Sequence, residues 1–348
     1  MDELKWYEKS GENADIVCST RVRLARNLNR EPFPAQANVK QKEEIAQKIS
    51  GALLNGNSVL SREFHFLPLE QLSQVQAAAL VERHIVSPEF ITDRLGKGVL
   101  VSEDESVSIM INEEDHLRIQ VLREGLCLKE AAETADRIDT LLSESLDFAF
   151  DKEFGYLTQC PTNLGTGMRA SLMVHLPALQ EGGAIPRVAA NLSKLGLTLR
   201  GAYGEGTQAA GAMYQLSNQI TLGLSENQAI ENLAAIAGQL MGEEKKIRQG
   251  MCENIAWQDK ITRAAGILKT ARLLSTGEAM ELLSTVRMGV AQGLLAGVDI
   301  GGLNGLMVKI QPAMLMAGEG KESGVAKRDQ LRASLLRTAL EGLCVAGC

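Results

Sequence analysis

GVLVSEDESVSIMINEEDHLRIQVL, residues 98–122, contains three short β-rich runs with alternating or continuous apolar side chains. We expect strands at Gly98–Val101, Val107–Asn112 and Leu117–Leu122. The two connections, which contain EDES and EEDH, are only five and four residues long. Parallel neighbours need a crossover of about a dozen residues, so these strands should pair antiparallel. The stretch therefore predicts a meander.

Helical patterns flank the meander at Val39–Leu54 and Leu128–Ser145, and Leu197–Ala202 predicts one more strand. The first part of the chain is therefore predicted to be α+β, an antiparallel sheet flanked by helices, and not a doubly wound nucleotide fold.

The pattern changes to helix after about residue 224. Ser225 and Ser275 each stand three residues before Gln or Glu and precede apolar residues at helical spacing. A last helix is expected at Arg328–Leu343. The 348 residues suffice for two domains, and we place them at 1–247 and 248–348, the second all-α.

Composition excludes several classes of protein. Lys and Arg total 36 against 43 Asp and Glu, a net charge of −7, so a uniformly basic nucleic-acid surface is absent. Aromatic residues make up 4%, which argues against base-stacking platforms. The chain contains neither an apolar run of about 18 residues nor a basic-then-apolar leader, so we expect no membrane span and a cytoplasmic location.

The six cysteines, at 18, 127, 160, 252, 344 and 348, form no Cys-x-x-Cys pair, so no metal site is predicted. We expect five of them to pack as small hydrophobic side chains. Cys160 stands apart because it begins Cys-Pro-Thr-Asn-Leu-Gly-Thr-Gly-Met-Arg169. Gly165 and Gly167 are expected to let the backbone approach a ligand, and nearby positive charge should favour the thiolate.

Three other segments combine arginines with acids or glycines. Ser19-Thr-Arg-Val-Arg23 places Arg21 and Arg23 on one face if extended, and the planar guanidinium suits phosphate oxygens. Asn112-Glu-Glu-Asp-His-Leu-Arg118 crowds three carboxylates into a turn, where acids raise one another's pKa. Arg200-Gly-Ala-Tyr-Gly-Glu205 ends a predicted strand. Alone, the first two are better explained as a solvated basic stretch and an acidic hairpin loop facing water.

These four segments, in this order, resemble the phosphagen (guanidino) kinases over roughly residues 15–247. The resemblance implies phosphoryl transfer from ATP, with Mg²⁺, to a guanidinium nitrogen. It implies that Glu114 and Glu205 orient the guanidinium and accept its proton, with Cys160 as a thiolate-like partner. The residues implied at the nucleotide are Ser19, Thr20, Arg21, Val22, Arg23, His84, Arg118, Arg169, Ala170, Ser171, Leu172, Met173, Arg200, Gly201, Ala202, Tyr203, Gly204 and Glu205. Residues 169–173 should line the nucleotide as one continuous piece.

The arrangement resembles the bacterial protein-arginine kinases within that family. Small-molecule phosphagen kinases carry a helical domain before the Ser-Thr-Arg segment, which here begins at residue 19, and this chain adds a helical C-terminal domain instead. The resemblance also implies an allosteric phosphoarginine pocket at Arg328, Asp329, Gln330, Leu331, Arg332 and Ala333.

The resemblance implies a role in stress response and protein degradation. Expected partners are proteins with exposed arginines, including a basic transcriptional repressor, a zinc-binding activator, an unfoldase–protease machine and a second copy of the chain. No nucleic acid or membrane partner is expected. Two alternatives stay open: a kinase of free arginine or another small guanidino compound, and a catalytically inactive phosphoarginine-binding adaptor.

Overall fold

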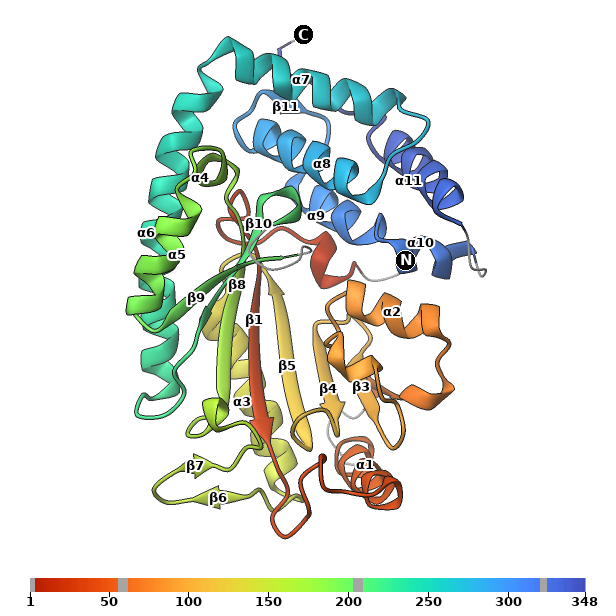
Figure 1. The fold of residues 1–348 in the computed structure, drawn as a ribbon, viewed down its shortest axis with the longest axis vertical. Helices are drawn as coiled ribbons and strands as arrows, with labels where there is room; N and C mark the ends of the chain where they lie inside the picture. The colour runs from red at the N-terminus through yellow and green to blue at the C-terminus, as the bar shows by residue number, and fades with distance from the viewer. Residues whose placement is uncertain (1–3, 56–61, 203–208, 320–323, 348) are drawn as a thin grey trace.

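An eight-stranded antiparallel sheet forms the centre of the computed structural model, which describes residues 4–55, 62–202, 209–319 and 324–347 (Figure 1). The strand order is β2-β3-β4-β5-β1-β8-β10-β9. The strands are β1 Val17–Arg26, β2 Phe64–Pro68, β3 Gly98–Ser102, β4 Val107–Ile111, β5 Leu117–Glu124, β8 Met168–His175, β9 Leu197–Gly201 and β10 Met213–Asn218.

The predicted meander is confirmed as β3, β4 and β5, paired antiparallel. The long strand β1 lies between β5 and β8 and pairs antiparallel with both. It joins the meander to the second half of the sheet and brings residues near position 20 next to residues near position 120. The helices of this part are α1 Val39–Leu54, α2 Gln74–Glu82, α3 Leu128–Ser143, α4 Pro177–Glu181, α5 Ile185–Lys194 and α6 Glu226–Cys252.

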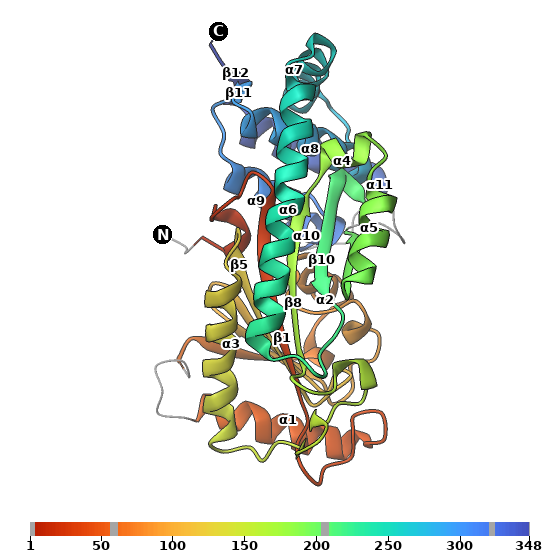
Figure 2. The same ribbon diagram turned by 90° about the vertical axis from the view of Figure 1, so that its left-hand side faces the viewer.

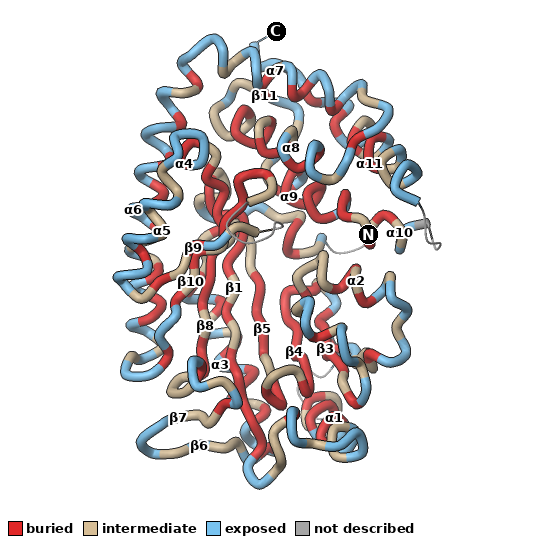
Figure 3. The backbone as a smooth tube through the Cα atoms, viewed as in Figure 1, coloured by how far each residue is buried: buried red, intermediate tan, exposed pale blue. Residues whose placement is uncertain are grey.

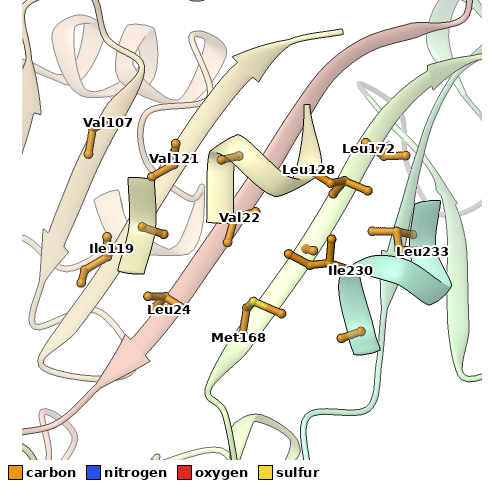
Figure 4. Close-up of a cluster of buried hydrophobic side chains, with 14 of the residues drawn as sticks. Val22, Leu24, Val107, Ile119, Val121, Leu128, Met168, Leu172, Ile230 and Leu233 are labelled. Carbon is orange, nitrogen blue, oxygen red and sulfur yellow. The ribbon is translucent and has the colours of Figure 1, made fainter. Parts of the chain in front are cut away.

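Alternation along the strands gives the sheet two unlike faces. Val22 and Leu24 of β1 point to the face covered by α3 and α6, where they belong to the same buried cluster as Leu128 and Leu233 (Figures 2 and 4). These side chains are buried, as are most residues of the central strands (Figure 3). Successive side chains of a strand point to opposite faces of the sheet. Arg21 and Arg23, which alternate with Val22 and Leu24, therefore lie on the other face.

The C-terminal part is helical, as predicted: α7 Ile255–Thr270, α8 Thr276–Ala291, α9 Ile300–Lys309, α10 Pro312–Glu319 and α11 Val325–Ala339. Two-stranded pairings join β11 Leu295–Ala296 to β12 Cys344–Val345, and β6 Phe150–Asp151 to β7 Gly155–Tyr156. The predicted caps are confirmed, since Ser225 and Ser275 accept hydrogen bonds from the N–H groups of Gln228 and Glu278. Nothing in the described ranges forms a helix long and apolar enough to cross a membrane.

The last helix begins and ends earlier than predicted. Residues 340–343 continue the apolar pattern, and Leu340 and Leu343 are buried, but they lie in the turn that leads to β12. The helical spacing of apolar residues predicted which side chains are buried but not where the helix ends.

Buried polar contacts join the two parts. Helix α6 runs without a break through residue 248, where we expected the domain boundary. Arg248 of α6 and Arg287 of α8 both donate to the carbonyl oxygen of Asp15, at 2.9 and 3.0 Å. The segment before β1 is therefore held between the sheet and the C-terminal helices.

Candidate active site

Arginines gather on the open face of the sheet. In register, Arg23 of β1 lies opposite Arg169 of β8, and its neighbour Ala25 lies opposite Arg118 of β5. Paired residues share a face, so Arg21 and all three of these arginines point the same way. The predicted common face for Arg21 and Arg23 is confirmed, and strand pairing adds two arginines from distant segments.

A cavity of about 610 Å³ opens on this face. All five arginines named for the nucleotide line it, and so does His84, just after α2. Its polar lining also includes residues that sequence reasoning missed, namely Glu82, Ser87, Glu89, Gln120, Thr198, Gln215, Ser217 and Gln219. Most of these residues are neutral, and a neutral polar residue in the sequence does not by itself indicate a binding site. Residues two apart on a strand share a face, however, so the sequence alone could have placed Gln120 beside Arg118.

Positive charge in the cavity is poorly compensated. Arg21 donates to Gln215 Oε1 at 2.6 Å and Ser171 Oγ at 3.3 Å, both uncharged. Burial, then repulsion from Arg118, lowers the pKa of Arg21 to about 10. Burial and repulsion from Arg21, Arg118 and Arg169 lower the pKa of Arg23 far more. Bound anions would relieve both effects.

Two buried polar atoms of the cavity residues also lack partners. Arg169 Nε and Thr198 Oγ1 make no hydrogen bond in the described part of the chain. Buried polar groups are normally paired, so these two atoms fit a polar ligand. Burial and Arg21 lower the pKa of His84 to about 4, which keeps its imidazole neutral near pH 7.

A smaller cavity of about 230 Å³ adjoins the first and shares three residues with it: Arg23, Arg118 and Arg169. Glu114 and Cys160 line only the smaller cavity. The structure therefore brings together two of the three predicted catalytic residues, separated from the larger cavity by a wall of arginines.

The acidic turn is not a solvated loop. Arg118 donates to Glu113 at 2.8 Å and to Glu114 at 3.2 Å. Asp115 is fully buried and accepts from Asn27 and from the Gln159 backbone, at 2.6 and 2.8 Å, which ties the turn to the segment before Cys160. The pKa of Glu114 is raised, chiefly by burial, while repulsion from Asp115 and Glu113 contributes less. Crowding of acids, the cause we expected, is secondary.

Cys160 has an extended backbone conformation and directly precedes a short 3₁₀ turn, Pro161–Asn163. Its Sγ lies 3.0 Å from Thr162 Oγ1. The expectation that the two glycines let the backbone approach a ligand stays a prediction, and Gly167 lines the smaller cavity. Gly165 and Gly167 have positive φ, and a Cβ on them would meet the carbonyl oxygens of Thr221 and Ala25 at 2.4 and 2.7 Å. They permit close packing of the protein's own backbone.

The expectation that residues 169–173 line the nucleotide continuously is wrong for their side chains. Arg169 lines the cavity and Ser171 contacts Arg21, but Ala170 and Leu172 point into the core, as Val22 does. A strand exposes only every second residue to one face. Four further positions contribute no side chain to the cavity lining, namely Ser19, Met173, Gly201 and Ala202.

Thr20 has a structural role: its hydroxyl donates to Gly125 O at 2.7 Å and accepts from Cys127 N at 2.9 Å. Tyr203, Gly204 and Glu205 lie outside the described residues. The expectation for the other cysteines holds for Cys18 and Cys252, which are buried, and is wrong for Cys344, which is exposed.

The Arg-Asp-Gln-Leu-Arg-Ala motif lies on α11. Arg332 is 1% exposed and donates to Ile310 O, Leu274 O and Asp329 Oδ1 at 2.9, 2.7 and 2.6 Å. Arg328 is half-buried, with a guanidinium nitrogen 4.0 Å from Met316 Sδ. Ala333 is buried, Leu331 and Asp329 are half-buried, and Gln330 is exposed.

Comparison with known proteins identifies both parts of the chain. Residues 44–247 match the model of the ATP:guanido phosphotransferase C-terminal catalytic domain, and residues 254–345 match the protein-arginine kinase McsB C-terminal domain. Protein-arginine kinases of Halothermothrix orenii and Moorella thermoacetica are 44% and 46% identical, over 96% and 97% of this chain and the same shares of their own.

Solved structures agree. A lombricine kinase superposes with a TM-score of 0.61 at 25% identity, covering 70% of this chain and 71% of its own. The duplicated taurocyamine kinase from Schistosoma mansoni gives 0.61 at 28% identity, covering 75% of this chain and 38% of its own. The chain thus belongs to the ATP:guanido phosphotransferase family, in the group with the protein-arginine kinase C-terminal domain, and is a phosphotransferase with a guanidino nitrogen as acceptor.

Proposed function

We propose that this chain transfers the terminal phosphoryl group of ATP to arginine side chains of proteins. The protein-arginine kinases to which it is similar match it over almost their full length, and they share the C-terminal domain. The observation that carries the chemistry is the wall of Arg23, Arg118 and Arg169 between the two cavities. A phosphoryl group passing from one cavity to the other would meet all three.

In this proposal ATP occupies the larger cavity, with its phosphates against the arginines and its other groups near His84, Gln215 and Thr198. Guanidinium groups pair with phosphate oxygens through two parallel N–H donors, which fixes orientation as well as charge. The described residues include no cluster of three His, Cys, Asp or Glu side chains suited to a metal ion. Mg²⁺ would therefore enter with the nucleotide, held mainly by phosphate oxygens, and supply further charge neutralisation.

The acceptor guanidinium would enter the smaller cavity. A guanidinium has a pKa above about 12, so it must lose a proton before a nitrogen can attack. Glu114 would accept that proton, which the raised pKa of its carboxyl favours. A nitrogen–phosphorus bond forms as the bond from the phosphorus to the leaving oxygen of ADP breaks. Cys160 would hold the guanidinium from the other side, and Glu205 would act as second carboxylate.

We also propose that the chain works in the cytoplasm as a homodimer in a stress response. Partners would be a basic repressor, a zinc-binding activator and an unfoldase–protease machine, and the Arg328–Ala333 motif would bind phosphoarginine. The dimer is supported by large apolar side chains exposed on and after α7, Ile255 at 76% and Leu273 at 61%. Basic substrates would be steered by the net charge of −7.

The test incubates the full chain with MgATP and either a basic protein or free arginine, and detects phosphoarginine by mass spectrometry without acid. Phosphorylation of the protein is expected, and it should be lost in Glu114→Gln and strongly reduced in Cys160→Ala. Cys127→Ala is the matched control, since Cys127 lines neither cavity. Turnover of free arginine alone would favour a small-molecule kinase, and no phosphoarginine in either arm would favour an adaptor.

A further inference from the structure

Glu82 links the nucleotide cavity to the C-terminal helices. It is the last residue of α2, lines the larger cavity and stands two residues before His84. Its carboxylate oxygens accept hydrogen bonds from Ala313 N at 2.9 Å and Met314 N at 2.7 Å. These N–H groups belong to the first turn of α10, where helices leave donors unpaired and favour negative charge. One side chain thus joins the wall of the cavity to the start of a helix in the other part of the chain.

Both arginines of the α11 motif contact α10 or the residues that lead into it. Arg332 donates to the carbonyl oxygen of Ile310, two residues before α10, at 2.9 Å. Arg328 contacts Met316 on α10 itself, with 4.0 Å between its guanidinium nitrogen and Sδ. Helix α2 packs against α10, and the two lie next to each other in Figure 1. A continuous set of contacts therefore runs from the motif through α10 to Glu82.

We propose that Glu82 is a positioning residue that couples the Arg328–Arg332 motif to the nucleotide cavity. This inference rests on the proposed function, in which the motif binds phosphoarginine. A phosphate bound to Arg332 would compete with Ile310 and Leu274 for its N–H donors. Loss of those bonds would let the start of α10 shift, and Glu82 would carry the shift into the cavity wall beside His84.

Electrostatics supports the same link. Burial raises the pKa of the Glu82 carboxyl, and the two α10 N–H groups and the charge of Arg332 oppose that rise. The charge of Arg332, which a bound phosphate would neutralise, therefore favours the ionised form of Glu82. Occupancy of the motif would weaken the attraction that holds Glu82 in place.

The test measures coupling as a ratio of dissociation constants. Free phosphoarginine is titrated into the full chain by calorimetry, with and without a non-hydrolysable ATP analogue and Mg²⁺. Allosteric coupling is commonly about 5-fold or more, so the analogue should tighten phosphoarginine binding by at least about 5-fold in the wild type. In Glu82→Gln, which keeps the side-chain size but loses the charge and one acceptor, the ratio should fall below about 2-fold.

Two variants act as controls. Glu89→Gln removes another carboxylate from the same cavity wall and should keep the wild-type ratio, because among the described residues the Glu89 carboxylate accepts no hydrogen bond from α10. Arg328→Lys should no longer bind phosphoarginine at the motif. Any phosphoarginine binding that remains in this variant is therefore binding at the active site. Thermal melting confirms that each variant is folded.

The outcomes separate the two proposals. If the wild type binds no phosphoarginine outside the active site, the regulatory role of the motif is wrong and the coupling role of Glu82 falls with it. If the wild type binds it and shows the coupling, but Glu82→Gln keeps the full ratio, only the role of Glu82 is overturned. A collapsed ratio in Glu82→Gln with retained phosphoarginine affinity supports the inference.

Discussion

Two sets of arginines in this molecule, one fully buried and one half-buried, are built in opposite ways. Arg248, Arg287 and Arg332 are at most 1% exposed, and each donates to several carbonyl or side-chain oxygens. Arg21 and Arg23 lie side by side on one face of β1 and line the open cavity, and burial and repulsion from neighbouring arginines lower their pKa values. Burial of an arginine therefore does not mark a binding site. What marks the site is a group of neighbouring arginines whose repulsion is largely uncompensated.

The largest effect is expected from Arg23→Met, in the uncompensated set. Phosphoryl transfer should fall by about 10³–10⁵-fold, the usual contribution of an arginine that stabilises the transition state. Thermal stability should stay level or rise, because one of several repelling buried charges is removed. Kinetics of phosphorylation and thermal melting of the same sample test both parts. A melting temperature well below the wild type would place Arg23 in the structural set.

Arg248→Met should have the opposite profile. Glu244 and Arg248 form an ion pair at 3.0 Å with both side chains fully buried, and Glu244 also accepts from Ala178 N and Leu179 N. Removing one partner of such a pair typically costs ~3–5 kcal/mol, so urea denaturation should show a loss of that size. Surface Lys246→Met on the same helix should change stability little. If both variants unfold at the same urea concentration, the compensated set has no structural role.

Much of this comparison was open to prediction from sequence. The meander, α1 and the two capping serines followed from local patterns, and the strand period put Arg21 and Arg23 on one face. The pairing of β1 with both β5 and β8 was not predictable, because it depends on contacts between residues far apart in the chain. That pairing assembles the arginine wall. The same limit hid the contact of Glu82 with α10 and the close packing of Gly165 and Gly167 against distant backbone.

The pH dependence of stability tests the cavity through His84. Its pKa is about 4 in the folded chain and about 6.5 when unfolded. The unfolded chain therefore binds the proton first, and stability should fall as the pH drops from about 6.5 towards 4. His84→Asn should lose less over this range, and asparagine tolerates the positive φ of 60° at this position. Urea denaturation at several pH values measures the difference. Burial also lowers the pKa of His175, so part of the pH dependence of stability should remain in the variant.

The smallest effects are expected from lysine substitutions in the motif on α11, where Arg332 and Arg328 should differ in their contribution to stability. By its contacts Arg332 belongs with the compensated arginines, because its three acceptors are two carbonyl oxygens and Asp329. A lysine cannot reach all three from a single ammonium group, so Arg332→Lys should destabilise the chain by about 1–2 kcal/mol. Arg328 is only half-buried, whereas Arg332 is 1% exposed, so Arg328→Lys should cost less than about 1 kcal/mol. Both should weaken phosphoarginine binding, since neither lysine offers a bidentate donor pair. Equal stability losses in the two variants would show that the motif is not divided in this way, and that Arg332 is not held by its three acceptors.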